Sequence, residues 1–217
     1  MPRHDALERR IGHRFADAAL LDQALTHRSA AARHNERLEF LGDGVLDCVI
    51  AEELFRRFPD LPEGKLTRVR AQLVRKEALN QLGRSLGVAD LVQVGPGAPL
   101  TPSILADAVE ALFGAVFLDG GYDAARSAIR AAFSDLLSGV DPEAVQKDAK
   151  TRLQELMHAR HKRLPEYSIV SEKLSAKANL FVVSCTLPDL GLTAQGSGAS
   201  RQQAEQEAAL AILERLA

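Results

Sequence analysis

Apolar residues in the first two thirds of the chain recur at intervals of three and four positions, which is the spacing of an amphipathic helix. Prolines and glycines interrupt this pattern at 59–62 and 95–97. No run of alternating polar and apolar residues, which would indicate a strand, occurs in this part of the sequence. The pattern therefore predicts helices over four stretches, at residues 7–25, 38–50, 63–86 and 104–118.

The last third of the chain shows a different pattern. Apolar residues at 181, 183, 185 and 187 alternate with Val182, Ser184 and Thr186, as in a strand with one buried face. Ser200 is a natural N-cap for a closing helix. The pattern predicts a small α+β domain in the order helix, three strands, helix, at residues 150–163, 167–174, 180–187, 190–196 and 200–216.

Glycine and proline at 139–142 mark the end of the helical part, and the charge changes beyond them. Residues 1–145 carry 21 acidic and 17 basic side chains, whereas residues 146–217 carry 8 and 10. A chain of 217 residues has room for two small domains. We therefore expect an all-helical domain over 1–140, a linker over 141–148 and the α+β domain over 149–217.

The composition, 46% hydrophobic and 26% charged, is that of a globular protein and excludes the disordered and low-complexity classes. No stretch reaches the roughly 18 unbroken apolar residues of a membrane span, and the N-terminus runs directly into charged residues. A cytoplasmic location without a membrane partner is therefore expected. The two cysteines, Cys48 and Cys185, lie far apart, so we expect small buried apolar groups rather than a disulfide or a zinc site.

Five carboxylates stand out because they share helix faces. At about 100° per residue, Glu36, Glu39 and Asp43 lie within roughly 60° of one another around a predicted helix. Asp107 and Glu110, three positions apart, share one face of a helix that is otherwise almost wholly apolar. Acids on so apolar a helix need an explanation.

Two carboxylates about 5 Å apart repel each other by roughly 3 kcal/mol at an effective dielectric constant near 20, so a cluster of several needs a cation or protons. A site made only of oxygen ligands is typical of Mg²⁺, with Mn²⁺ as the alternative, and such an ion activates water for attack on a phosphodiester. The competing interpretation is that these acids lie on solvated helix faces, paired with arginines such as Arg33 and Arg37. The spacing leaves both open, because it does not show that the two helices meet.

Several long motifs resemble the ribonuclease III family, in the order that this family has them. NERLEFLGD at 35–43 is similar to its signature segment, and SILADAVEALFGAVFLD at 103–119 to its second acidic segment. FPDLPEGKLTRVRAQLV at 58–74 resembles the stretch between them. TRLQEL at 151–156 and GSGASRQQAEQEAA at 196–209 resemble the double-stranded-RNA-binding domain of that family. The resemblance implies a ribonuclease III fold followed by an α-β-β-β-α RNA-binding domain.

The resemblance also implies an activity and roles for the acids. It implies a magnesium-dependent, homodimeric endoribonuclease that leaves 5′-phosphate ends and short 3′ overhangs on double-stranded RNA, and that processes ribosomal RNA precursors and other structured transcripts. Glu39, Asp107 and Glu110 match the metal ligands, and Asp43 with Glu110 matches the residues assigned to catalysis. Glu36 and Glu63 match further acids of the same valley. Phe40 matches an aromatic of the dimer interface; a plain core residue is the alternative.

For the RNA-binding domain, the resemblance implies three contact regions on a duplex. Thr151, Gln154 and Glu155 would meet one minor groove, Lys177 a second, and Ser200 with Arg201 the phosphates between them. The sequence departs from the family where Gln202 and Gln203 replace basic residues, where the segment 97–102 is shorter and less basic, and where Gly44 replaces a serine.

These departures keep two further interpretations open beside the enzyme. One is a dimeric duplex-RNA-binding protein with weak or no cleavage, because each lost phosphate contact weakens binding by roughly half a decade between 50 and 200 mM salt. The other is a helical scaffold with an RNA-binding tail and no metal site. The complete set of acids favours the enzyme, since clustered carboxylates would repel RNA in a protein that only binds it.

Overall fold

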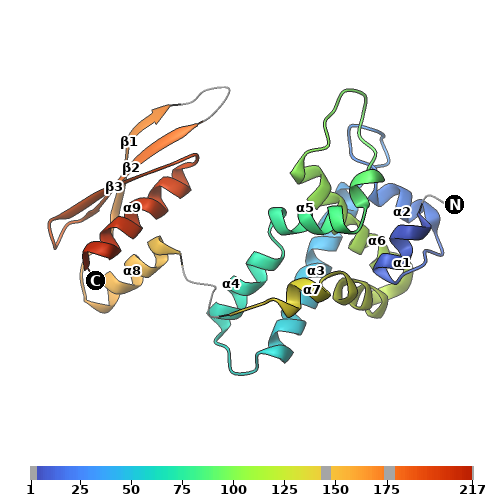
Figure 1. Ribbon diagram of the computed structural model, residues 1–217, viewed down its shortest axis with the longest axis horizontal. Coiled ribbons are helices and arrows are strands. Elements are labelled where there is room, and N and C mark those ends of the chain that lie inside the picture. Colours follow the sequence, from blue (N-terminus) through green and yellow to red (C-terminus); the bar gives the residue numbers. More distant parts are fainter. Residues whose placement is uncertain (1–3, 143–147, 174–178, 217) are drawn as a thin grey trace. The chain divides into compact units, whose positions relative to one another are not determined.

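The computed structural model describes residues 4–142, 148–173 and 179–216 and divides the chain into two compact units, Met1–Val145 and Gln146–Ala217 (Figure 1). Each unit has a hydrophobic core of its own. None of the described helices is long and apolar enough to cross a membrane.

The first unit is built from helices, which confirms the predicted all-helical domain. Within its described residues the only pairing of extended backbone is one isolated parallel bridge between Thr26 and Gln93. The elements are α1 (Asp5–Ile11), α2 (Ala18–Ala24), α3 (Glu36–Arg57), α4 (Glu63–Leu73), α5 (Lys76–Ser85), the short 3₁₀ helix η1 (Val88–Asp90), α6 (Pro102–Ala132) and α7 (Ser134–Ser138).

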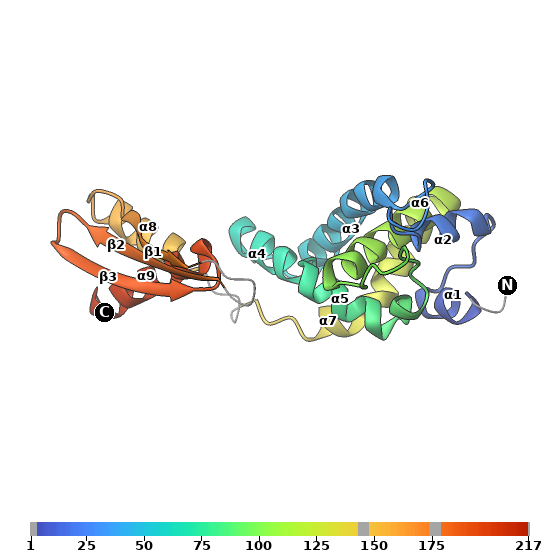
Figure 2. The same cartoon turned by 90° about the horizontal axis from the view of Figure 1, so that it is seen from above.

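Helices α3 and α6 form the most extensive helix pair of this unit, and α5 packs along α6 as well (Figure 2). Their apolar stripes supply fully buried residues such as Leu46, Ile50, Leu112 and Phe113. Burying one large apolar side chain stabilises the fold by about 1.5–3 kcal/mol, and several such side chains hold the two long helices against each other. The polar residues on these helices are thereby fixed in position.

Several of the predicted helix boundaries in this unit are wrong. The stretch 7–25 contains two helices, α1 and α2, and the helix predicted over 38–50 covers Glu36–Arg57. The stretch 63–86 is two helices, because Arg75 adopts an extended conformation with ψ 153° between α4 and α5. Leu73, before the break, and Leu79, after it, both belong to the core of this unit. The helix predicted over 104–118 continues to Ala132, with a change of direction at Gly121, whose φ of 77° lies in the left-handed region.

The second unit has the predicted order α-β-β-β-α. It consists of α8 (Ala149–Ala159), β1 (Glu166–Lys173), β2 (Leu180–Leu187), β3 (Leu192–Gly198) and α9 (Arg201–Leu216). The three strands form one antiparallel sheet in the order β1-β2-β3, and both helices cover one face of it (Figure 1). Cys185 lies opposite Tyr167 and Ala194 on that face and is fully buried. The α+β assignment is therefore confirmed.

Two boundaries in the second unit also differ from the sequence prediction. Helix α8 ends at Ala159 rather than 163, because His161 takes a φ of 51° and the Lys162 amide donates to the Met157 carbonyl, which closes the last turn. Strand β3 covers Leu192–Gly198 rather than 190–196, because the chain turns at Gly191 with a φ of 61°.

Cysteine burial was predicted correctly for one of the two residues. Cys185 is buried, but Cys48 is exposed on α3, where its sulfur lies 3.7 Å from the Tyr122 hydroxyl. Neither cysteine is part of a disulfide.

Candidate functional site

Two glycines bring the backbones of α3 and α6 into direct contact. A Cβ atom on Gly42 would lie 1.8 Å from the carbonyl oxygen of Glu110, and one on Gly114 would lie 2.2 Å from the carbonyl oxygen of Leu38. No side chain fits at either position without moving a helix. The acids that flank Gly42 on α3 are therefore held beside those on α6.

Three carboxylates meet at this contact. Glu39 from α3 and Asp107 and Glu110 from α6 each offer one oxygen, and these oxygens all lie within 4.8 Å of one another. All three residues are partly buried. Asp43, one helical turn after Glu39, is exposed and close enough for its charge to act on both glutamates. The structure thus brings together the two acidic segments that the sequence alone left apart.

The crowding of acids shifts their protonation. Burial, followed by the negative charges of Asp43, Asp107 and Glu39, raises the pKa of Glu110 from 4.5 to about 7. Burial, followed by the charge of Asp107, also raises the pKa of Glu39. Lys76 lowers the pKa of both groups, but its effect is smaller than that of burial. Without a cation, the cluster therefore retains protons near neutral pH.

The donor set fits a hard divalent ion. All three ligand atoms are carboxylate oxygens, and none of the described histidines or cysteines belongs to the group. Mg²⁺ and Mn²⁺ take such oxygen ligands and keep water in their remaining positions, whereas Zn²⁺ sites are usually built with histidine or cysteine. A divalent ion would also remove the repulsion that raises the pKa of Glu110. Glu39, Asp107 and Glu110 are the residues that would hold it.

Lys76 is the residue of this site that sequence reasoning missed. Its Nζ donates to Ser103 Oγ over 2.9 Å and to Asp107 Oδ1 over 3.2 Å. A lysine at the start of a helix is an unusual choice and could have been a signal. The signal was hidden because the sequence pattern placed Lys76 in the middle of one long helix.

The remaining acids and the aromatic expected at the site lie outside the three-carboxylate group. Glu36 begins α3 and forms an ion pair with Arg28 at 3.0 Å. Glu63 begins α4 and accepts a hydrogen bond from Thr67. Phe40 is 84% exposed, so it is not a core residue of the single chain. It borders a hollow whose lining includes Leu20, Gln23, Arg37, Leu41 and Leu118.

Comparison with known proteins agrees with this division of the chain. Residues 17–136 match the family described as Ribonuclease-III-like, and residues 149–216 match the double-stranded RNA binding motif. The chain belongs to the ribonuclease III family. The resemblance seen in the sequence motifs is confirmed.

Relatives of this ribonuclease III family member match it over nearly its whole length. A protein named Ribonuclease 3 from Bordetella petrii is 51% identical over 213 residues, which cover 96% of this chain and 84% of that protein. Ribonuclease 3 from Thiobacillus denitrificans is 49% identical over 208 residues, or 94% and 92% of the two chains. The solved nuclease domain of ribonuclease III from Campylobacter jejuni is 38% identical, with a TM-score of 0.59, and covers 65% of this chain and 100% of that one.

In the RNA-binding motif of this family member, the expected contact residues that the structure describes lie on α8, on α9 or at the start of α9. Thr151 and Gln154 lie on α8, where the Thr151 amide and hydroxyl both donate to the N-cap Asp148. Ser200 caps α9 by accepting from the Gln203 amide, as predicted. Arg201 is exposed and its Nε donates to Glu205. Glu155 lies on α8 as well, and Lys177 lies outside the described residues.

Arg201 shares its carboxylate partner with a second cation. Glu205 is 7% exposed and accepts from both Arg201 and Lys150. These two contacts lower the pKa of Glu205, although burial alone would raise it. The cation at the start of α9 is therefore held beside a carboxylate in the absence of RNA.

We expect metal binding by this ribonuclease III to strengthen as the pH rises. Because the pKa of Glu110 is about 7, a proton must leave when an ion binds below that value. Mn²⁺ affinity should therefore increase up to about tenfold per pH unit between pH 6 and 7 and level off above pH 8. Calorimetric titration with MnCl₂ at pH 6, 7 and 8 measures this, and Glu110→Gln should flatten the dependence. Equal affinity at pH 6 and 8 in the wild type would contradict the shift.

Proposed function

We propose that this protein is a metal-dependent endoribonuclease that hydrolyses phosphodiester bonds in double-stranded RNA. The observation that carries the proposal is the group of Glu39, Asp107 and Glu110 oxygens within 4.8 Å of one another, on a nuclease fold joined to a double-stranded RNA binding motif. Relatives named Ribonuclease 3, about 50% identical along most of the chain, support the same activity. We take Mg²⁺ as the ion, with Mn²⁺ as the alternative.

In this proposal Glu39, Asp107 and Glu110 would hold the ion through their carboxylate oxygens. When bound, the ion lowers the pKa of water and offsets the charge of the phosphate. Asp43, whose carboxylate is exposed beside the three ligands, orients the attacking water and accepts its proton. Water attacks phosphorus in line with the 3′ oxygen, whose bond to phosphorus breaks as that oxygen takes up a proton from solvent water. The products then carry 5′-phosphate and 3′-hydroxyl ends.

The proposal includes a homodimer in which each site cuts one strand and leaves a short 3′ overhang. Phe40 supports this, because a phenylalanine that is 84% exposed beside a hollow lined in part by leucines removes apolar surface from water on association. A related nuclease domain from Campylobacter jejuni, 39% identical with a TM-score of 0.58, was described for the flexibility of a region involved in dimer formation. Sedimentation should report a dimer for the wild type and a larger monomer fraction for Phe40→Asp.

Ribonuclease III activity also suggests where the protein works. We propose that it acts in the cytoplasm on structured transcripts such as ribosomal RNA precursors.

Glu36 and Glu63, which lie outside the three-carboxylate group, are proposed as further acids along the RNA-binding valley.

The second candidate is a duplex-RNA-binding dimer with weak or no cleavage. Two observations favour it: Arg201 is followed by Gln202 and Gln203, and the segment 91–101 before α6 contains no lysine or arginine. Both reduce the number of cations available to phosphates.

One experiment separates the two candidates. A labelled perfect duplex of several tens of base pairs is incubated with the protein at low salt, with Mg²⁺ or with EDTA, and analysed on a denaturing and a native gel. Staggered cuts in both strands that need Mg²⁺ support the endoribonuclease. A duplex that shifts on the native gel but stays intact at every Mg²⁺ concentration supports the binding protein.

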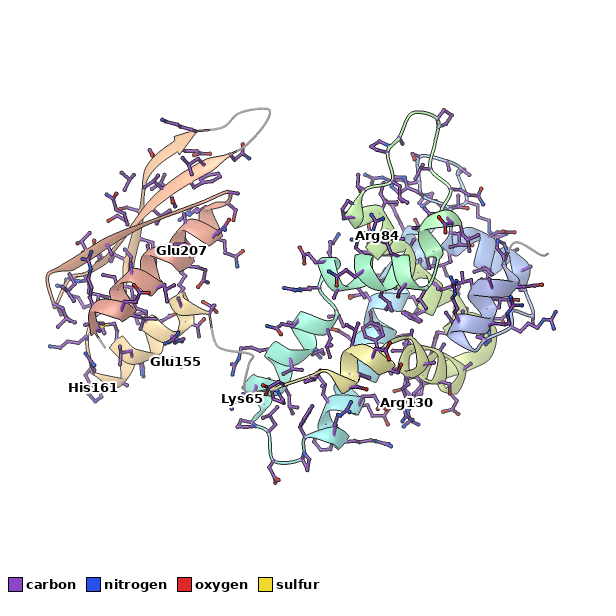
Figure 3. All side chains as sticks on the ribbon, viewed as in Figure 1. Lys65, Arg84, Arg130, Glu155, His161 and Glu207 are labelled. Carbon is purple, nitrogen blue, oxygen red and sulfur yellow. The ribbon has the colours of Figure 1, made fainter. Side chains whose placement is uncertain are left out.

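The start of α9 allows a matched test of RNA binding. Replacing Gln202 with lysine adds a cation at the helix N-terminus, where phosphates bind, so the slope of log Kd against log salt should steepen by about 0.7–0.9. Glu207→Gln changes the net charge by the same amount further along the exposed side of α9 (Figure 3). The control should change the slope by less than half as much. Fluorescence anisotropy with CaCl₂ in place of Mg²⁺ measures both variants; equal slopes would show that net charge alone matters.

A further inference from the structure

Lys76 stands at a position that opposes its charge. It is the first residue of α5, and the N-terminal end of a helix carries a partial positive charge that disfavours cations. Its side chain is 62% exposed, so water rather than burial surrounds most of it. A cation retained there needs a compensating interaction.

The compensating interactions lie on the helix that carries the metal ligands. Lys76 Nζ donates to Ser103 Oγ over 2.9 Å and to Asp107 Oδ1 over 3.2 Å. Ser103 and Asp107 stand one turn apart at the start of α6, and Asp107 belongs to the three-carboxylate group. The ammonium group is thus an additional component of the site, in contact with one of its three ligands.

A purely structural role does not account for these contacts. Exposed ion pairs contribute little to the stability of a folded protein. Helix α5 is already held against α6 at Gly83, where an added Cβ would lie 2.8 Å from Leu105 Cγ and 2.9 Å from Val109 Cγ2. Contact this close is maintained by buried apolar surface. The lysine is therefore not needed to dock the helix.

The negative charge at the site exceeds what one divalent ion can neutralise. Glu39, Asp107 and Glu110 could hold a divalent ion, and Asp43 lies close enough for its charge to act on Glu110. A phosphodiester adds one more negative charge. One divalent ion offsets two of these charges. The segment 91–101, which leads into α6, carries no lysine or arginine that could offset more. Lys76 supplies a positive charge at this place.

We propose that Lys76 is a further catalytic residue, whose ammonium group rests on Asp107 in the free protein and donates to a nonbridging oxygen of the scissile phosphate in the RNA complex. Ser103 Oγ accepts a hydrogen bond from the ammonium group in both states and keeps it at the site. This inference rests on the proposed endoribonuclease function. It has two consequences. The lysine lowers the affinity for a divalent ion, because it competes with the ion for Asp107, and it raises the cleavage rate, because it donates to the phosphate.

The variant Lys76→Met tests both consequences. Without RNA, MnCl₂ titration by calorimetry should give an affinity roughly 3- to 10-fold higher than that of the wild type, because one competing charge is gone. At saturating Mg²⁺, single-turnover cleavage of a labelled duplex should fall by roughly 100-fold, as when one donor to a developing negative charge is lost. Duplex affinity in CaCl₂ should stay within about threefold. Lys76→Arg should restore most of the cleavage rate.

The matched control is Arg84→Met, which removes one positive charge from the other end of α5 (Figure 3). It should leave both Mn²⁺ affinity and the cleavage rate within about twofold of the wild type. Circular dichroism checks that Lys76→Met keeps the wild-type melting temperature, as expected for an exposed side chain at a helix start.

Three outcomes would overturn the inference. Cleavage by Lys76→Met at the wild-type rate removes the phosphate role. Weaker Mn²⁺ binding together with slower cleavage would mean that the lysine only positions Asp107. A wild type that fails to cleave at any Mg²⁺ concentration removes the proposed function itself, and the Lys76 role with it.

Discussion

Replacing Glu110 with glutamine is expected to lower single-turnover cleavage of duplex RNA by at least ~10³-fold, because the variant loses both a metal ligand and the charge that attracts the ion. Duplex affinity measured in CaCl₂ should remain within about threefold, since Glu110 is partly buried between helices of the nuclease unit and lies outside the RNA-binding unit. Rapid-quench cleavage and anisotropy measure the two quantities.

A matched control for Glu110→Gln is Glu8→Gln, which also converts a glutamate to its amide on a helix of the nuclease unit. Glu8 lies on α1 and accepts a hydrogen bond from the Phe15 amide, away from the three carboxylates. It should cleave within about threefold of the wild type. Equal loss of cleavage and duplex affinity in Glu110→Gln would contradict the proposed role of Glu110 as a metal ligand.

Glu110→Gln, although it lowers cleavage, should stabilise the metal-free protein at high pH. The pKa of Glu110 in the folded protein, about 7, lies above its ordinary value of 4.5, so the folded state binds this proton more tightly than the unfolded state. The resulting stabilisation is fully present below pH 4.5 and is lost as the pH rises through 7. Without metal, Glu110→Gln should therefore melt at a higher temperature relative to the wild type at pH 8 than at pH 5. The acid is retained at the site at a cost in stability.

The second large effect is expected at Gly42, where α3 and α6 touch. In Gly42→Ala the added Cβ would lie 1.8 Å from the Glu110 carbonyl oxygen and 2.9 Å from the Gly114 amide nitrogen, so the helices must separate. We expect a loss of at least ~3 kcal/mol in the free energy of unfolding. Cleavage should fall by at least ~100-fold even where the variant is folded, because displacement by about 1 Å separates the ligands.

Gly44→Ala provides the matched control for Gly42→Ala. It makes the same chemical change two residues further along α3, where an added Cβ would meet nothing within 4 Å. Alanine has a higher helix propensity than glycine, so stability should increase by roughly 0.5–1 kcal/mol. Thermal melts and single-turnover cleavage compare the two variants. Similar stability changes in both would show that the close approach of α3 and α6 does not depend on Gly42.

Local sequence signals predicted the element types in both units. The alternation around Cys185 identified β2 with the observed bounds, and Ser200 was identified as the cap of α9. Both signals involve residues within a few positions of one another, so they do not depend on the rest of the fold. The boundaries at α4, α5 and β3 were missed, because the sequence pattern did not show the extended conformation of Arg75 or the turn at Gly191.

Exposure was harder to predict than secondary structure. Cys48 and Phe40 are both apolar residues of α3, yet each is exposed. Apolar residues occur on most faces of α3, so periodicity gives no clear choice of the buried side. Packing against α6 determines it. The same packing explains why Lys76, unremarkable in the sequence, lies at the carboxylates.

By itself the sequence determined the two kinds of domain, the helices that carry the acids, and the shared face of Glu39 and Asp43. These follow from helical periodicity, which is a property of neighbouring residues. Only the tertiary structure decided that Glu39 meets Asp107 and Glu110, and that Lys76 joins them. Those contacts link residues far apart in the chain, and they form because two glycines let α3 and α6 approach while the buried apolar side chains around them hold the helices together.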